Sequence, residues 1–162
     1  MKVDFEKLYA QTYDDLYRFV ASRVSMRHDA EDLVEDTYLR ALSSMDRVKS
    51  NPRAWVFKIA ANRIKNYYRD KKPMNAIPES IQSMQDVEHT ILTAERAREL
   101  ASALSHLPDD DQILVSLRYF SHLSYRDIAQ AMQITQTAAR VRMTRALKKL
   151  KRLLQNGSVS NG

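Results

Sequence analysis

Apolar residues recur at steps of three and four along most of the chain, a spacing that predicts amphipathic helices. A first helix is expected over 4–23. A second is expected to begin at Asp29, acting as its N-cap, and a third at Asn51-Pro52, where an asparagine cap precedes a proline at the first helical position. The third helix should continue to about Lys72. Three amphipathic helices with short connections predict a compact bundle.

Residues 74–85 carry a proline, several serines and glutamines and only weak periodicity, which is typical of a linker. Helical spacing returns over 86–105 and 109–120, followed by a short helix and a longer one. The predicted fold class is therefore all-α, with two small helical domains joined by a flexible linker and a four-helix C-terminal module. We place the domains at 1–73 and 86–156, with a frayed, disordered tail at 157–162.

The last two helices have the spacing of a helix-turn-helix. Ser124 and Asp127 form a capping pair at the start of a helix of about two turns, Gln133-Ile134 makes the turn, and Thr135 caps the next helix. The second of these helices has a stripe of residues that we expect to be buried: Ala139, Met143, Ala146, Leu147, Leu150 and Leu154.

The face opposite that stripe is almost entirely threonine, valine, arginine and lysine. Placing residues about 100° apart puts these side chains on it: Thr137, Val141, Thr144, Arg145, Lys148 and Arg152. Arg140 and Arg142 fall on its flanks, where they could reach phosphates, while a central Val141 could touch a thymine methyl group. A solvated basic surface on an ordinary bundle is the alternative for such a stripe. The short helix and turn before it favour DNA binding.

The net charge of +6 is unevenly distributed along the 162 residues. The balance of basic over acidic residues is −2 in 1–50, +6 in 51–73, −6 in 74–111 and +8 in 112–162. Two basic regions separated by an acidic stretch suggest two nucleic-acid contacts.

The first of these basic regions forms a stripe along the third predicted helix, made of Lys58, Asn62, Lys65, Arg69 and Lys72. Trp55 lies in the apolar stripe of the same helix and is expected to pack in the core. Phe57 and Tyr68 are expected on the exposed flank beside the basic stripe, as stacking platforms for unpaired bases.

Leu39 is expected to point outward from the second helix, surrounded by Asp32, Glu35 and Asp36. An isolated exposed leucine needs no function. An apolar anchor within an acidic rim also suits a basic partner protein, and we favour that interpretation.

Several classes of function are excluded or disfavoured. The chain has no cysteine, and no glycine precedes Gly157, so phosphate-binding loops of the common kinds are absent. The four histidines lack ligand spacing, and the acidic run at 109–111 fits the first turn of a helix better than a metal site. No catalytic constellation is apparent, so we expect neither an enzyme nor a cofactor. No membrane span or signal peptide is apparent, and a cytoplasmic location is expected.

Taken in order, these segments resemble the extracytoplasmic-function sigma factors of bacterial RNA polymerase, members of the sigma-70 family. The resemblance rests on residues 29–40 (DAEDLVEDTYLR), 51–62 (NPRAWVFKIAAN), Leu107-Pro108, 117–120 (LRYF) and 123–129 (LSYRDIA). It implies that the N-terminal bundle corresponds to sigma region 2 and the C-terminal module to region 4. It further implies binding without catalysis to core RNA polymerase and promoter DNA, and control by an anti-sigma factor.

The resemblance assigns roles to particular residues. Polymerase binding would involve Asp32, Glu35, Asp36, Leu39 and Arg40. The minus-ten element would be held by Asn51, Arg53, Lys58, Asn62, Lys65, Asn66, Arg69 and Lys72, with a base flipped into the loop at 43–51. The minus-thirty-five element would be read by Gln136, Thr137, Arg140, Val141, Arg142, Thr144, Arg145 and Lys148.

Three departures from the family pattern affect these expectations. Gln133 stands where the family usually has a turn glycine and would have to adopt positive φ. The recognition helix opens with residues 137–142 (TAARVR) instead of the usual Gly-Thr-Val-Lys-Ser-Arg, so promoter preference cannot be transferred. Asn66 replaces a frequent aspartate and removes a charge that would repel phosphate.

The main alternative is a free-standing repressor or activator, with the N-terminal bundle binding a ligand or forming a dimer. It accounts equally well for the C-terminal helix-turn-helix. It leaves the second basic stripe on the third helix without a role.

Overall fold

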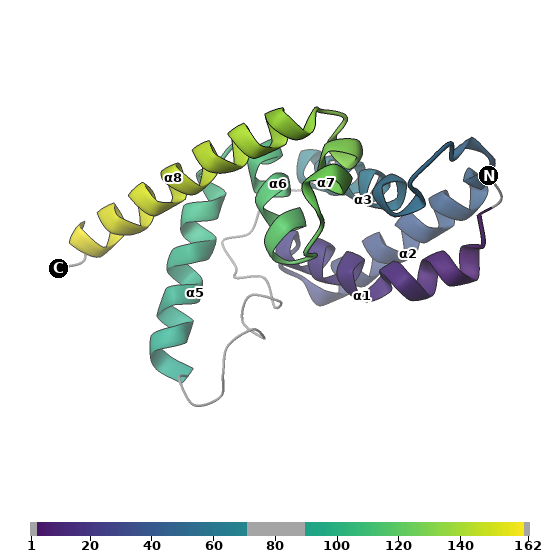
Figure 1. Cartoon of the computed structure of the whole chain (residues 1–162). Helices are drawn as coiled ribbons and strands as arrows, with labels where there is room; N and C mark the ends of the chain where they lie inside the picture. The colour runs from purple at the N-terminus through teal and green to yellow at the C-terminus, as the bar shows by residue number, and fades with distance from the viewer. Residues whose placement is uncertain (1–2, 71–89, 161–162) are drawn as a thin grey trace.

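The computed structural model describes residues 3–70 and 90–160, which are helical with no strand. Figure 1 shows the arrangement, with the N-terminal helices on the right and the long last helix running along the top to the left. The helices are α1 (Phe5–Arg23), α2 (Arg27–Ser43), the short 3-10 helix η1 (Met45–Arg47), α3 (Pro52–Asp70), α5 (Thr90–Ser105), α6 (Asp109–Tyr119), α7 (Tyr125–Met132) and α8 (Gln136–Ser160). The predicted all-α fold and the four-helix C-terminal module are confirmed. The predicted linker lies outside the described residues.

Helices α1, α2 and α3 form the N-terminal bundle around a largely apolar core. Leu16 and Phe19 of α1 and Val56 of α3 are fully buried. The core also contains a polar pair, because the hydroxyl groups of Thr12 and Tyr38 lie 2.7 Å apart and Thr12 also donates to the carbonyl of Leu8. Each buried hydroxyl therefore has a partner, as burial of polar groups requires.

The start of α2 differs from the prediction. The helix begins at Arg27, and the amide of Ala30 already donates to the carbonyl of Met26 at 3.0 Å. Asp29 therefore lies inside the first turn. Its carboxylate accepts a 2.8 Å hydrogen bond from the Tyr67 hydroxyl on α3, so it contributes to helix packing, and the predicted N-cap role is wrong.

The caps of the other helices follow the sequence. The Asn51 side chain accepts from the Ala54 amide at the start of α3, the Ser124 hydroxyl accepts from the Asp127 amide, and the Thr135 hydroxyl accepts from the Ala138 amide. Gln133 has φ 58° and ψ 46°, in the left-handed region. The turn between α7 and α8 thus has the positive φ that was expected of it, although glutamine has a Cβ that glycine lacks.

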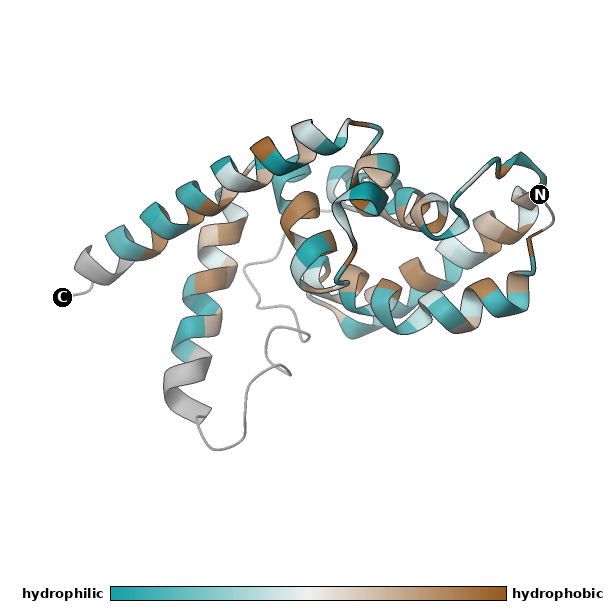
Figure 2. Cartoon of the chain, in the orientation of Figure 1, coloured by the Kyte–Doolittle hydropathy of each residue, from teal (hydrophilic) through white to brown (hydrophobic). Residues whose placement is uncertain are grey.

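Helix α8 packs on α6 and α7 through part of the predicted stripe, and Ala139, Met143 and Ala146 are buried. Leu147 was predicted to be buried and is exposed at 36%. The reason is that α5 and α8 diverge, as Figure 1 shows, and leave between them a groove of about 720 Å³ on which Leu147 lies. Figure 2 shows hydrophobic positions on the facing sides of both helices. Helix α8 continues through Ser160, beyond the end predicted at residue 156.

The two halves of the chain pack directly against each other. Helix α3 lies along α7 and α1 contacts α6, so the buried apolar residues of both halves form one continuous core. Sequence periodicity identified the two halves but not this contact, which brings the third helix beside the helix-turn-helix.

Candidate nucleic-acid interface

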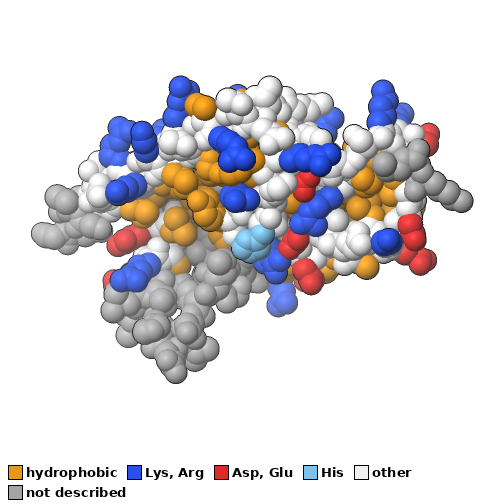
Figure 3. Space-filling model, viewed as in Figure 1, with side chains coloured by type: hydrophobic (Ala, Val, Ile, Leu, Met, Phe, Trp, Pro, Cys, Tyr) orange, Lys and Arg blue, Asp and Glu red, His pale blue; other side chains and the backbone are white. Residues whose placement is uncertain are grey.

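The outward face of α8 is exposed from Thr137 to Arg152, as predicted. Thr137, Thr144, Arg145, Lys148 and Arg152 are all exposed, as is Gln136 at the start of the helix. Val141, at the centre of this face, is 43% exposed. Figure 3 shows lysine and arginine side chains along α8. An exposed helix face of this composition at the second position of a helix-turn-helix fits the major groove of duplex DNA.

Arg140 is exposed but has a protein partner at its head group. Its guanidinium carbon lies 4.5 Å from the centroid of the Tyr125 ring, and Arg118 contacts the same ring at 4.8 Å. Arg118 in turn donates to the Leu123 carbonyl at 2.8 Å. The contact with the Tyr125 ring restricts the orientations of the Arg140 side chain. Arg140 would therefore lose less side-chain freedom if it bound DNA in this orientation.

The polar stripe predicted on α3 is present, but it is not wholly open to solvent. Asn62, Lys65 and Arg69 are exposed, whereas Lys58 and Asn66 are partly buried. Lys72 lies outside the described residues. Lys58, Asn62 and Lys65 line a small polar hollow together with residues of the C-terminal module, namely Asp110, Met132, Gln133 and Arg142. The central part of the predicted minus-ten surface therefore faces α6, α7 and α8.

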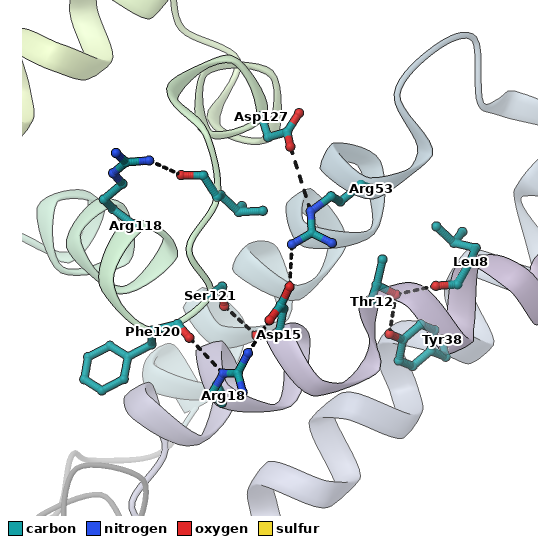
Figure 4. Close-up of polar contacts among 11 residues, drawn as sticks. Leu8, Thr12, Asp15, Arg18, Tyr38, Arg53, Arg118, Phe120, Ser121 and Asp127 are labelled. Carbon is teal, nitrogen blue, oxygen red and sulfur yellow. Dashed lines mark hydrogen bonds and ion pairs between the residues drawn. The ribbon is translucent and has the colours of Figure 1, made fainter. Parts of the chain in front are cut away.

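Asn51 and Arg53, at the start of α3, also contact the C-terminal module. The Asn51 amide donates to Asp127 at 2.8 Å and to the Gln130 side chain. One Arg53 nitrogen lies 2.6 Å from Asp15, and another lies 3.8 Å from Asp127. Figure 4 shows Arg53 between these two carboxylates.

Neither aromatic residue expected to stack on bases is freely exposed. Phe57 is completely buried, with its ring 6.0 Å from that of Phe19, and the predicted platform role is wrong. A single helix pattern could not place Phe57, because α3 contacts α1, α2 and α7 and buries more than one stripe. Tyr68 is partly buried, with the Arg23 guanidinium 5.5 Å from its ring centroid, and burial raises the pKa of its hydroxyl. Trp55, expected in the core, is partly buried against it.

The loop between α2 and α3 contains η1 and is mostly exposed or partly buried, with Val48 its one buried residue. Met45 is the first residue of η1. Asn51 ends the loop with a φ of 46°, which sequence reasoning did not anticipate. The loop therefore enters the start of α3 through a residue with a left-handed backbone conformation.

The acidic surface of α2 has the predicted apolar anchor and a second one that sequence reasoning missed. Leu39 is 58% exposed and Leu42, three residues later on the same helix, is 51% exposed. Asp32, Glu35 and Arg40 are exposed beside them. Asp36 is partly buried and already paired, 3.1 Å from Arg40 and 2.7 Å from Arg63, so it offers less free charge than its neighbours.

A cluster of potential metal-ligating side chains lies at the start of α2. His28, Asp29 and Asp32 bring ligand-type atoms within 4.8 Å of one another at the start of α2. Asp29 is engaged by Tyr67, and His28 is 3.4 Å from Asp32, so these contacts account for the cluster within the protein. Among the described helices, none is both long and apolar enough to cross a membrane.

Comparison with known proteins agrees with the two modules. Residues 8–73 match the family model described as Sigma-70 region 2, and residues 97–150 match the model described as Sigma-70, region 4. The extracytoplasmic-function (ECF) RNA polymerase sigma factor SigM of Bacillus subtilis (strain 168) is 29% identical over 161 residues, covering 94% of this chain and 96% of SigM.

Two solved structures share the fold. CnrH in complex with the cytosolic domain of CnrY has a TM-score of 0.71 at 24% identity, covering 94% of this chain and 88% of CnrH. The sigma factor RpoE in complex with the anti-sigma factor NepR from Bartonella quintana has a TM-score of 0.67 at 24% identity, covering 94% and 97% of the two chains.

A three-helix bundle followed by a helix-turn-helix module matches, in order, the two modules of a promoter-recognition factor. The chain belongs to the sigma-70 family, within its extracytoplasmic-function group. Proteins of this family are transcription initiation factors that bind core RNA polymerase and direct it to promoters.

Proposed function

We propose that this chain directs core RNA polymerase to promoters through three surfaces, one for the polymerase and two for DNA. The observation that carries the proposal is the order of the two modules, each with a basic or polar helix face suited to one promoter element. Both DNA surfaces would act by binding alone, and the chemistry of RNA synthesis would belong to the polymerase.

The polymerase surface in this proposal is the exposed side of α2. Leu39 and Leu42 supply apolar anchors, and Asp32 and Glu35 supply an acidic rim for a basic partner surface. Arg40 would contribute at its edge. Asp36 would mainly hold α2 to α3, because it pairs with Arg63.

The minus-ten surface is proposed on α3 and the loop before it. Lys65 and Arg69 would contact phosphates, and Asn62 and Asn66 could hydrogen-bond to bases of the separated strand. The full proposed set is Asn51, Arg53, Lys58, Asn62, Lys65, Asn66, Arg69 and Lys72. A base flipped into the 43–51 loop would cost a few kcal/mol of stacking, offset by the pocket and by polymerase contacts.

The minus-thirty-five surface is proposed on α8. Arg145 and Val141 lie near the centre of the exposed face and would contact base edges, whereas Arg142 would reach a phosphate from its flank. The full proposed set is Gln136, Thr137, Arg140, Val141, Arg142, Thr144, Arg145 and Lys148.

Regulation by an anti-sigma protein is also proposed. The RpoE relative was solved in complex with the anti-sigma factor NepR, and a chain of the same fold could be held inactive in a similar manner. A sigma factor works where the polymerase and the chromosome are, so we place this chain in the cytoplasm.

The proposal is tested by transcription of fragmented genomic DNA from the source bacterium with purified core polymerase, with and without this chain. New transcripts should start downstream of a shared pair of sequence elements only when the chain is present. Start sites that are the same in both reactions would contradict the proposal. Tight sequence-specific binding to duplex DNA without polymerase would favour a free-standing repressor or activator.

A further inference from the structure

A single aromatic ring on α7 contacts arginine side chains from two neighbouring helices. Tyr125 is the first residue of α7, and the guanidinium carbons of Arg118 on α6 and Arg140 on α8 lie 4.8 and 4.5 Å from its ring centroid. Arg118 also donates to the Leu123 carbonyl at 2.8 Å, as Figure 4 shows. The Tyr125 side chain is partly buried and packs against the core. The fold therefore fixes this ring, and the ring can hold an exposed side chain in place.

The two arginines that share the ring lack a counterion within the described residues. Neither Arg118 nor Arg140 forms an ion pair with a carboxylate there. A guanidinium group keeps its charge in proteins, so two positive charges lie beside one ring and repel each other. The charge at this place therefore favours an anionic group from a ligand, and on duplex DNA that group is a backbone phosphate.

The ring contact also determines the side of α8 on which Arg140 lies. Arg140 comes one residue before Val141, the centre of the exposed face, and so lies about 100° away from it around the helix. Its guanidinium is held over a residue at the start of α7. In a helix-turn-helix, the first helix crosses the DNA backbone while the second enters the major groove. Arg140 is therefore placed toward the wall of the groove, where phosphates lie, and away from the base edges.

We propose that Tyr125 is a positioning residue for the minus-thirty-five surface: its ring holds Arg140 ready to bind a backbone phosphate, and base reading is left to Val141 and Arg145. A guanidinium held over a ring keeps the N–H groups at its edges available. Ordering a long side chain on binding weakens affinity by about two- to tenfold, and the ring contact removes this cost because Arg140 is already ordered. The role of Tyr125 deepens the minus-thirty-five surface of the proposed function and rests on it.

Double-variant cycles test whether Tyr125 acts through Arg140. Affinity is measured for the full chain in complex with core polymerase, on one promoter obtained from the genomic transcription experiment. Tyr125→Leu, which removes the ring, should weaken binding by about two- to tenfold, but should have no further effect when Arg140→Ala is already present. The matched control is Arg142, an exposed arginine on the other flank of α8 that contacts no aromatic ring among the described residues. Tyr125→Leu and Arg142→Ala should be additive.

Tyr125→Phe separates the role of the ring from that of the hydroxyl group. Phenylalanine keeps the aromatic face, so the affinity should stay within about twofold of that of the wild-type chain. A loss as large as that of Tyr125→Leu would mean that the hydroxyl group contacts DNA directly, and would overturn the positioning role. Additive effects of Tyr125→Leu and Arg140→Ala would overturn it as well. Circular dichroism verifies that each variant is folded.

The phosphate contact of Arg140 has a readout of its own. Arg140→Ala should reduce the slope of log affinity against log salt concentration by about 0.9, as the loss of one phosphate contact does. It should also weaken binding to an intact promoter and to one with an altered minus-thirty-five element by the same factor. Tyr125→Leu should keep the slope, since Arg140 still reaches the phosphate once bound. If Arg140→Ala changed the ratio of affinities for the two promoters, Arg140 would read a base and the phosphate assignment would be overturned.

Nuclear magnetic resonance on the free chain tests the ring contact without DNA. The ring current of Tyr125 should shift the side-chain protons of Arg140 upfield in the wild-type chain and in Tyr125→Phe, and the shift should disappear in Tyr125→Leu. Unshifted Arg140 protons in the wild-type chain would overturn the positioning role, and this result needs no folded leucine variant. If the chain bound no promoter together with core polymerase, the proposed function would fail, while these shifts would still decide whether Tyr125 holds Arg140.

Discussion

Phe57 gives the sharpest test of how α3 packs in the core, since its sequence position suggested a base-stacking role and the structure buries it completely. Replacing a buried phenylalanine by alanine costs about 3–5 kcal/mol, through lost burial and the cavity left behind. Part of that loss is the ring contact with Phe19 at 6.0 Å. At roughly 2–4 °C per kcal/mol for a chain of this size, Phe57→Ala should lower the Tm by about 6–20 °C.

Thermal unfolding followed by far-UV circular dichroism measures this effect. The matched control is Tyr119→Ala, which truncates an aromatic residue that is 49% exposed on α6 and should cost less than about 1 kcal/mol. If Phe57→Ala melted within about 2 °C of the wild-type chain and bound single-stranded DNA more weakly, Phe57 would be a stacking platform after all, and the packing described for α3 would be incorrect.

Three further variants test other parts of the account. Arg145→Ala should weaken binding of the polymerase complex to minus-thirty-five DNA by about 1–3 kcal/mol. The control is Lys149→Ala, and a footprint of Arg145→Ala equal to that of the control would show that Arg145 does not contact this DNA. Leu39→Asp should lower the affinity of the chain for core polymerase on the order of tenfold, about 1.4 kcal/mol, without changing its stability. If the variant competed with the wild-type chain for core polymerase as well as the wild type does, Leu39 would have no role in the contact. Burial raises the pKa of Tyr38 to about 12, so the unfolded chain loses this proton first as pH rises above 10, and stability should fall between about pH 10 and 12. In Tyr38→Phe, urea titrations over that range should show a smaller loss; an equal loss would assign the alkaline sensitivity to other groups.

The caps and the helix-turn-helix could be predicted because their determinants are local. Ser124, Thr135 and Asn51 each bond to an amide three residues along the chain, and each cap was identified from sequence. The positive φ of Gln133 was expected from the family resemblance, which usually places a glycine at this turn position, and not from the residue itself. The exposed face of α8 followed from helical periodicity alone.

Errors arose where distant segments determine the environment. Phe57 is buried because several helices surround α3. Asp29 does not cap α2 because the helix begins two residues earlier, and its carboxylate bonds instead to Tyr67, 38 residues away. Leu147 is exposed because α5 diverges from α8. The contact of Asn51 and Arg53 with Asp127 joins positions more than 70 residues apart and has no local pattern to reveal it. The candidate minus-ten residues could thus be proposed from sequence, but the contacts of Asn51, Arg53 and Lys65 with carboxylates could not.

The most direct measurement for the central claim is the mapping of strand separation on a single promoter obtained from the genomic transcription experiment. Permanganate reactivity of unpaired thymines would be measured with core polymerase alone, with this chain alone, and with both together. The account predicts reactivity around the minus-ten element, and a run-off transcript, only when both are present. A sequence-specific footprint by the chain alone, with no strand separation when polymerase is added, would contradict it.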